Sequence, residues 1–189
     1  MTSQIADDAT SRLTATVLWG LIALYAAARV LQVLPGKVPM LAVVALHVLV
    51  PAAFALIHGS AIYRVRGIVV FLALFLGVGN IIENVAVLTG LPFGAYYFTS
   101  VMGPKLFAVP VFLGLAYVGM GYLSWVLSSV ILGEPGGPLT GARVVTVPLI
   151  AALIMTAWDL SQDPVWSTIL RAWIWVRGGP TSACLSAIS

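Results

Sequence analysis

The chain of 189 residues is 61% hydrophobic and only 8% charged, and its formal net charge is +3. An ordinary soluble domain carries ~25% charged residues, so this composition excludes a water-soluble globular protein. No cluster of basic residues forms the footprint of a nucleic-acid-binding surface. We therefore interpret residues 1–189 as a single integral-membrane helical domain that lies in the lipid bilayer.

Apolar runs of about the length that crosses a bilayer, ~20 residues, recur along the chain. They predict five membrane-spanning helices at residues 13–34, 38–58, 68–88, 106–132 and 144–160. Residues 1–12, which precede the first run, are polar and acidic, unlike a secretory signal peptide. We therefore expect the first span to be retained. Pro and Gly residues interrupt the pattern between the runs.

Two aromatic-rich segments lie outside these runs. Residues 95–105, AYYFTSVMGPK, predict an interfacial or re-entrant segment, because aromatic side chains favour the membrane–water boundary. Residues 165–179, VWSTILRAWIWVRGG, predict a partial or interfacial C-terminal helix. The predicted fold is an all-α polytopic bundle of about five spans plus this helix. Its orientation stays open, because the basic residues divide equally between the two sides.

Two acidic residues lie inside the predicted spans, Glu83 in the third and Asp159 in the fifth. A charged carboxylate at the centre of a bilayer costs roughly 2.5–3.5 kcal/mol on insertion scales. Such a group persists by facing the interior of the bundle, by pairing, or by holding a proton. Asp163 lies one turn beyond Asp159 on the same face if that helix continues.

The side chains around Glu83 share its helix face. At 3.6 residues per turn, Asn80 and Asn84 lie beside it and can hydrogen-bond to it or to its ligand. Two interpretations are open at this point. This polar group joins neighbouring helices through hydrogen bonds, or it forms an internal functional site together with Asp159.

The two histidines and the single cysteine do not indicate a metal centre. His47 and His58 are eleven residues apart and lack the Glu-x-x-His or His-x-x-x-His spacing of helical metal ligands. Cys184 alone cannot form an intrachain disulfide or a multi-thiolate site. We expect no metal and no cofactor.

Two stretches of the sequence resemble the integral-membrane carotenoid biosynthesis family. They are ENVAVLTGLPFGAYYFTSVMGPKLFAVPV and MTAWDLSQDPVWSTILRAWIWVRGGP, within residues 79–111 and 155–180. The specific features are a Glu-x-x-x-x-x-Thr-Gly-x-Pro-Phe-Gly-x-Tyr pattern and a Trp-Asp-x-x-x-Asp-Pro pattern. The first eighty residues agree only in being hydrophobic. The family includes the carotenoid 1,2-hydratases and bisanhydrobacterioruberin hydratase.

The resemblance implies a cofactor-independent hydro-lyase of the cell membrane that acts in carotenoid biosynthesis. Such an enzyme hydrates the terminal C1=C2 double bond of an acyclic carotenoid end group and leaves a tertiary alcohol. Protonation of the less substituted carbon gives a tertiary carbocation, which captures a water. The chemistry needs a buried carboxylic acid, and it needs negative charge or aromatic faces near the cation. Association with other carotenoid biosynthesis enzymes is a further expectation.

The candidate site residues follow from the resemblance and from the acids inside the spans. We expect Asp159 or Glu83 to donate the proton, and Asp163 to orient or deprotonate the water. The expected substrate-binding residues are Asn80, Asn84, Thr89, Phe93, Tyr96, Tyr97 and Trp158.

Two rival hypotheses are open. A small membrane transporter or scaffold would use Glu83 and Asp159 as a proton relay, with TGLPFG as a helix break of the kind found in transporters. A related enzyme would isomerise or cyclise the same end group through the same cation. Gradient-dependent flux would indicate a transporter, and only hydration adds a water to the product mass.

The resemblance also implies further residues after RAWIWVRGGP, beginning Tyr-Phe-Gly-Val-Pro-Leu, where this chain reads TSACLSAIS. One choice of codons for this tail encodes the implied residues when it is read one frame over. We therefore expect residues 181–189 to be an aberrant tail and the chain to be truncated by a frameshift. Missing helices would leave lipid-facing surfaces, and with them the site, incomplete. The coding DNA decides this expectation.

Overall fold

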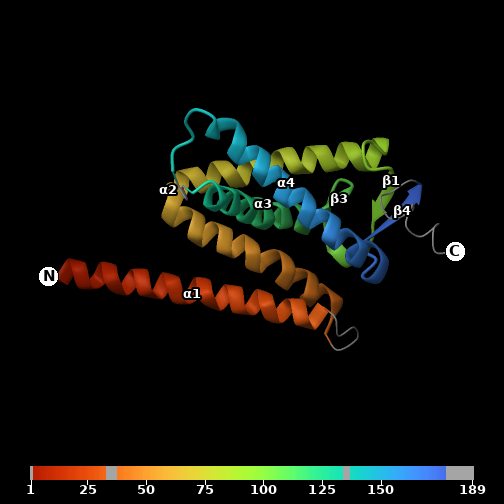
Figure 1. Ribbon diagram of the computed structural model, residues 1–189. Helices are drawn as coiled ribbons and strands as arrows, with labels where there is room; N and C mark the ends of the chain where they lie inside the picture. Colours follow the sequence, from red (N-terminus) through yellow and green to blue (C-terminus); the bar gives the residue numbers. More distant parts are fainter. Residues whose placement is uncertain (1, 33–37, 134–136, 178–189) are drawn as a thin grey trace.

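Four long helices dominate the structure, a computed structural model that describes residues 2–32, 38–133 and 137–177. They are α1 (Thr2–Gln32), α2 (Met40–Thr89), α3 (Val111–Ile131) and α4 (Arg143–Pro164) (Figure 1). Each contains a stretch that is long and apolar enough to cross a membrane. The prediction of an all-α membrane bundle is therefore confirmed. The helix α1 begins at Thr2, so the polar segment before the first predicted span is helical from residue 2 and forms one helix with that span.

The helix α2 is a hairpin of two arms rather than one straight rod. Arg64 breaks it with φ 59° and ψ 160°, and Figure 1 shows α2 running to one end of the bundle and returning. Near the reversal a Cβ on Gly59 would lie 2.6 Å from Ile68 Cδ1, so a larger residue there would displace the Ile68 side chain. The arms correspond to the predicted spans 38–58 and 68–88, and the turn between them is shorter than predicted.

Small residues let α3 pack closely against both arms of α2. A Cβ on Gly119 would lie 2.6 Å from Pro51 of the first arm, and one on Gly114 would lie 3.0 Å from Leu76 of the second arm. On the side of α4, the Ser128 hydroxyl donates a 2.9 Å hydrogen bond to the carbonyl of Val147. Without a hydrophobic driving force between helices in lipid, such small-residue contacts and hydrogen bonds hold a bundle together. The helix α3 is therefore the centre of the fold.

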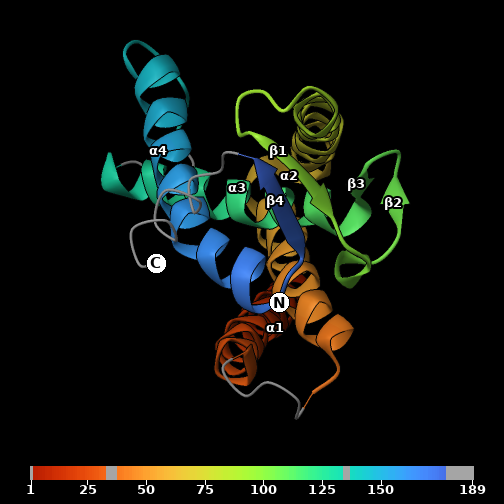
Figure 2. The same ribbon diagram turned by 90° about the vertical axis from the view of Figure 1, so that its right-hand side faces the viewer.

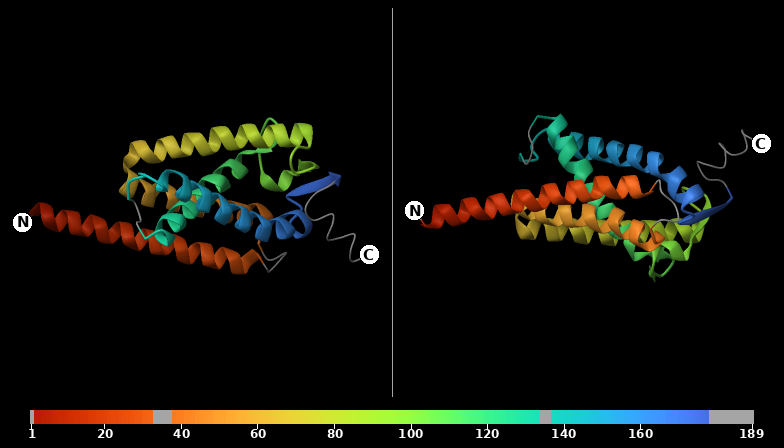
Figure 3. Two further views of the ribbon diagram at one scale, coloured as in Figure 1. Left: turned by 45° about the horizontal axis from the view of Figure 1, so that its top comes forward. Right: turned by 90° about the horizontal axis from the view of Figure 1, so that it is seen from below.

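The helices α1 and α4 lie on the outside of the bundle (Figure 3), and both carry exposed apolar side chains. Trp19 on α1 is 70% exposed, and Leu153 on α4 is 62% exposed. In water this exposure would be costly, whereas in a bilayer it is the surface that contacts lipid tails.

Short strands gather at one end of the bundle (Figure 2). The strand β1 (Ala95–Phe98) pairs antiparallel with β4 (Trp173–Arg177), and β2 (Lys105–Leu106) pairs with β3 (Val109–Pro110). A 3₁₀ turn, η1 (Ser100–Met102), follows β1, and a π-helical turn, η2 (Val165–Ile169), links α4 to β4. Residues from the middle and the end of the sequence thus meet at this end.

This strand cap corrects two sequence predictions. The predicted C-terminal helix is wrong beyond η2, because Arg171 has a positive φ of 52° and the following WIWVR segment pairs with β1. The predicted fourth span begins at Val111 instead of residue 106, because β2 and β3 occupy residues 105–110. The predicted tail 181–189, with Cys184, lies outside the described residues.

Candidate functional site

Three carboxyl groups surround one cavity beside the β1–β4 strand pair. Glu83 comes from the second arm of α2, and Asp159 and Asp163 stand one turn apart near the end of α4. Among them only Glu83 is buried, at 9% exposed, and the two aspartates are half-buried. The remaining walls of this cavity of about 90 Å³, here the carboxyl cavity, are Phe93, Tyr96, Phe98, Leu113, Tyr117, Trp173 and Trp175. The structure brings the three predicted acids together around this one cavity.

Two tyrosine hydroxyls hold Glu83. The Tyr96 hydroxyl donates a 2.7 Å hydrogen bond to Oε2, and the Tyr117 hydroxyl of α3 donates a short hydrogen bond to Oε1. Both carboxylate oxygens therefore act as acceptors, and hydrogen bonds to an ionised acceptor are among the strong ones. Glu83 is fixed in position by groups from two other elements.

The two aspartates are placed differently. Neither side chain has a hydrogen-bond donor within the described ranges, and none of the three acids forms an ion pair with an Arg or Lys side chain there. The carbonyl of Asp163 accepts a 2.6 Å hydrogen bond from Ser167, but its carboxyl group remains open to the cavity. Asp159 and Asp163 are thus the acids whose oxygens are available to a ligand.

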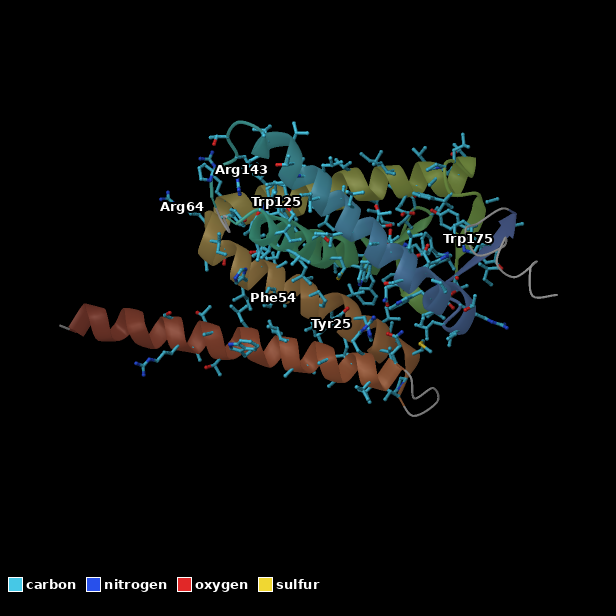
Figure 4. The ribbon with its side chains drawn as sticks, viewed as in Figure 1. Tyr25, Phe54, Arg64, Trp125, Arg143 and Trp175 are labelled. Atoms are coloured by element: carbon cyan, nitrogen blue, oxygen red, sulfur yellow. The ribbon has the colours of Figure 1, made fainter. Side chains whose placement is uncertain are left out.

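Aromatic rings form a large part of the lining of the carboxyl cavity. The strand register places Tyr96 across from Trp175 and Phe98 across from Trp173. The ring centroids of Tyr96 and Trp175 are 4.9 Å apart, and those of Phe98 and Trp173 are 6.1 Å apart. Trp175 is labelled in Figure 4 at this end, whereas Arg64 and Arg143 mark the opposite end of the bundle. Aromatic faces carry the negative side of a quadrupole, which attracts cations.

Tyr96 stays a hydrogen-bond donor over a wide pH range. Burial raises the pKa of its hydroxyl above the ordinary value, and the neighbouring Glu83 carboxylate raises it further. The phenol is therefore protonated at any physiological pH and can keep donating to Glu83.

Asn80 and Asn84 hydrogen-bond to each other and to the segment before α3, and not to Glu83 as expected. The side-chain amide of Asn84 donates to the carbonyl oxygen and to Oδ1 of Asn80, at 2.8 and 3.0 Å. Its own Oδ1 accepts a 3.0 Å hydrogen bond from the backbone N–H of Ala108. This pair anchors the segment before α3 to α2, and neither residue lines the carboxyl cavity.

The other expected substrate-binding residues divide between the cavities and the outer surface. Phe93 and Tyr96 line the carboxyl cavity, and Trp158 lines a neighbouring cavity on the side of α1. Thr89 is exposed, and its hydroxyl donates a 2.7 Å hydrogen bond to the carbonyl of Val85, near the end of α2. Tyr97 points the other way along β1 and is 49% exposed. Thr89 and Tyr97 are therefore outside the site as the structure has it.

Two further cavities adjoin the carboxyl cavity. An apolar groove of about 470 Å³ lies between the second arm of α2 and α4, and its walls include Leu74, Phe75, Val78, Gly79, Ile82, Phe93, Ala152, Met155 and Thr156. A smaller cavity of about 50 Å³, here the α1-side cavity, includes Tyr25, Arg29, His47, Trp158, Gln162 and Trp166. All three cavities share two residues, Tyr117 and Asp159. These two stand where an apolar space and a partly polar space meet.

Several of these residues were not expected from the sequence. Tyr117 lies in an uninterrupted apolar run without an acidic or amide neighbour that would single it out. Arg29 and Gln162 come from helices at opposite ends of the sequence, and Arg29 Nη1 donates a 2.6 Å hydrogen bond to Gln162 Oε1. The i, i+3 spacing of Gln162 from Asp159 was a usable signal.

The geometry defines a class of protein: a bundle of helices long and apolar enough to cross a membrane, with a cavity lined by three carboxyl groups and aromatic rings beside an apolar groove. Among the described residues, no three His, Cys, Asp or Glu side chains gather closely enough to hold a metal ion. A family model described as "Carotenoid biosynthesis protein" matches residues 36–182, which is most of the chain. No curated protein and no solved structure gave a match. The chain belongs to the carotenoid biosynthesis protein family.

Proposed function

We propose that this protein is a carotenoid hydratase of the cell membrane, which adds water to the terminal C1=C2 double bond of an acyclic carotenoid end group. The observation that carries the proposal is the meeting of Glu83, Asp159 and Asp163 around one cavity with aromatic walls. Alkene hydration needs an acid, a stabilised cation and a positioned water. This cavity has a residue suited to each of the three tasks.

Asp159 is the proton donor in this proposal. It lines the carboxyl cavity and the apolar groove together, and no described residue occupies its carboxyl oxygens by donating a hydrogen bond. Glu83 is less suited to this task, because two tyrosine hydroxyls already donate to its oxygens. The proton of the Asp159 carboxyl passes to C2, and the π electrons form the new C–H bond. C1 is left as a tertiary cation.

Glu83 and the aromatic wall stabilise the cation. The carboxylate is held in place before the reaction, so it need not reorganise when positive charge develops, and such preorganised charge contributes strongly in a dry site. The rings of Tyr96 and Trp175 add their faces on another side. A water then forms the C1–O bond and gives its proton to Asp163, and proton transfer to Asp159 restores the starting state.

The apolar groove is the proposed binding site for the polyene chain. It lies between the second arm of α2 and α4, and its lining includes Glu83 and Asp159. A carotenoid dissolved in the bilayer would enter sideways, with its chain among Phe75, Ile82 and Met155.

Expression in a lycopene-producing host tests the proposal. We expect the extracted pigment to gain one water in mass, as seen by liquid chromatography and mass spectrometry. The Asp159→Asn variant, inserted in the membrane to the same level, should leave the pigment unchanged. Unchanged pigment in both cases, with lycopene and with other acyclic carotenoids, would contradict the proposal. A product of unchanged mass but altered spectrum would indicate isomerisation or cyclisation through the same cation.

A further inference from the structure

The α1-side cavity has the size and lining of a site for water. Its volume is about 50 Å³, and a buried water needs a cavity of at least about 10–15 Å³. Its polar walls are Arg29, His47, Gln162, Asp159 and Asp163. A water needs two to four polar partners to be held in a buried site, and these residues supply them.

His47 has an unused hydrogen-bond acceptor in the wall of this cavity. The side chain is 7% exposed, and its Nδ1 lies 2.8 Å from the carbonyl oxygen of Val43. A carbonyl only accepts, so Nδ1 carries the proton, and Nε2 of the neutral ring is an acceptor. Nε2 is buried and has no partner among the described residues. A buried acceptor without a partner costs free energy, which a bound O–H donor would recover.

Neighbouring rings hold the imidazole in this orientation. Tyr25 of α1 and Trp166 of η2 contact it edge-on, with centroid distances of 5.7 and 5.9 Å. The hydrogen bond from Arg29 to Gln162 ties α1 to α4 beside it. The ring is therefore positioned by three elements, as a residue that orients a ligand has to be.

We propose that the α1-side cavity holds the water that adds to the substrate, and that His47 positions it for Asp163. This inference rests on the proposed hydratase function. Hydrocarbon would reach Asp159 from the apolar groove, and water would reach it from the opposite side. His47 Nε2 accepts one hydrogen of the water, and Asp163, which lines both the α1-side and the carboxyl cavities, accepts the other. The water oxygen is then free to form the C1–O bond.

The fate of the cation distinguishes a positioning residue from a structural one. When the water is missing, the cation returns to an alkene by losing a proton from C2 or from a methyl group. In D₂O, Asp159 delivers a deuteron to C2. Each time the cation loses a proton before a water has added, the recovered alkene therefore carries deuterium. The ratio of hydrated product to deuterium in recovered substrate therefore measures water capture separately from protonation.

The experiment uses membranes that contain the full chain, an added acyclic carotenoid and D₂O buffer. We expect His47→Leu to lower the ratio of hydration to deuterium exchange by at least about tenfold, the scale of a lost positioning contact. His47→Gln, which keeps a hydrogen-bond acceptor, should restore part of it. His58→Leu is the matched control. His58 is on the same arm of α2, but its Nδ1 lies 2.7 Å from the Tyr122 hydroxyl, and it lines none of the three cavities. The ratio of hydration to exchange in His58→Leu should therefore match that of the unchanged protein.

The possible outcomes separate this inference from the proposed function. A parallel loss of hydration and exchange in His47→Leu would show a structural role and overturn the water site, while hydration itself stands. An unchanged ratio would overturn it as well. Neither hydration nor exchange in the unchanged protein would instead contradict the proposed function.

Discussion

The Tyr96 hydroxyl donates a 2.7 Å hydrogen bond to Glu83 Oε2 and so joins strand β1 to the second arm of α2. A second donor, Tyr117 of α3, binds the other oxygen. Glu83 is therefore a fixed centre on which a helix, a strand and a further helix converge. In the proposed mechanism this carboxylate is the preorganised negative charge beside the cation.

Removal of the Tyr117 hydroxyl should weaken the reaction without unfolding the protein. A hydrogen bond to a charged group contributes about 1.5–3 kcal/mol, so Tyr117→Phe should lower the hydration rate about 10- to 100-fold. Tyr97→Phe is the matched control, because Tyr97 is 49% exposed and lines none of the three cavities. Rates of pigment hydration in membranes with equal protein content measure both. Equal rates for the two variants would contradict the role of Tyr117.

Replacement of Asp159 should have the largest effect of any single change at the site. General acid catalysis contributes about 10²- to 10⁴-fold, so Asp159→Asn should lose at least the lower figure. Asp159→Glu retains a carboxylic acid and should keep measurable activity. Hydration and deuterium exchange should fall together in Asp159→Asn, each by at least about 100-fold. Exchange that persists in this variant would show that another group protonates the alkene.

Blocking the apolar groove should affect long substrates more than short ones. Ala152 lines the groove, whereas its neighbour Leu153 does not and is 62% exposed. We expect Ala152→Phe to raise KM for a full-length carotenoid by about tenfold and to change little for a short isoprenoid with the same end group. Leu153→Phe should leave both substrates unaffected. Equal effects on the two substrates would contradict polyene binding in the groove.

The amide of Asn84 should matter for stability more than for chemistry. Asn84→Ala leaves the N–H of Ala108 without its acceptor, at a cost of about 1–3 kcal/mol. Asn84→Gln keeps an uncharged amide oxygen that can reach the Ala108 N–H, so its loss of stability should be smaller. The melting temperatures of the unchanged protein and the two variants, measured in detergent, give the order of their stabilities. If Asn84→Ala is as stable as the unchanged protein but inactive, Asn84 contacts the substrate after all.

The contribution of Tyr96 to stability should depend on pH in one direction only. Burial and the Glu83 carboxylate raise the pKa of its hydroxyl in the folded state, so the folded state holds this proton more tightly than the unfolded chain does. The stabilisation is present below the ordinary pKa of about 10 and declines as the pH rises above it. The difference in melting temperature between the unchanged protein and Tyr96→Phe should be constant from about pH 7 to about pH 9 and shrink above about pH 10. A difference that grows above pH 10 would contradict this.

The long helices were predictable because apolar runs carry their own signal. The spans at α1, both arms of α2, α3 and α4 lie close to the predicted ranges. The β1–β4 pair was not predictable, because hydrogen bonds between residues about eighty positions apart leave no local periodicity. The WIWVR segment is rich in residues that favour strands, but its composition does not indicate β1 as its partner.

The site was partly predictable for a similar reason. Glu83, Asp159 and Asp163 stand out because ionisable groups in an apolar chain are costly. Tyr117 carries no such cost and looks like an ordinary bundle residue in the sequence, whereas His47 stands out there but lacks the spacing of a metal ligand. Their roles depend on which groups the fold brings to them. The asparagines beside Glu83 show the opposite error. Their shared helix face predicted a contact with Glu83, but Asn84 accepts a hydrogen bond from Ala108 in the loop before α3.

The isotope content of the product tests the central claim most directly. Membranes containing the unchanged protein, given an acyclic carotenoid in D₂O enriched in oxygen-18, should form an alcohol with one deuterium at C2 and one oxygen-18 at C1. Asp159→Asn membranes should form none of it. An alcohol whose oxygen does not come from water, or one that carries no deuterium at C2, would contradict hydration by acid protonation and water capture.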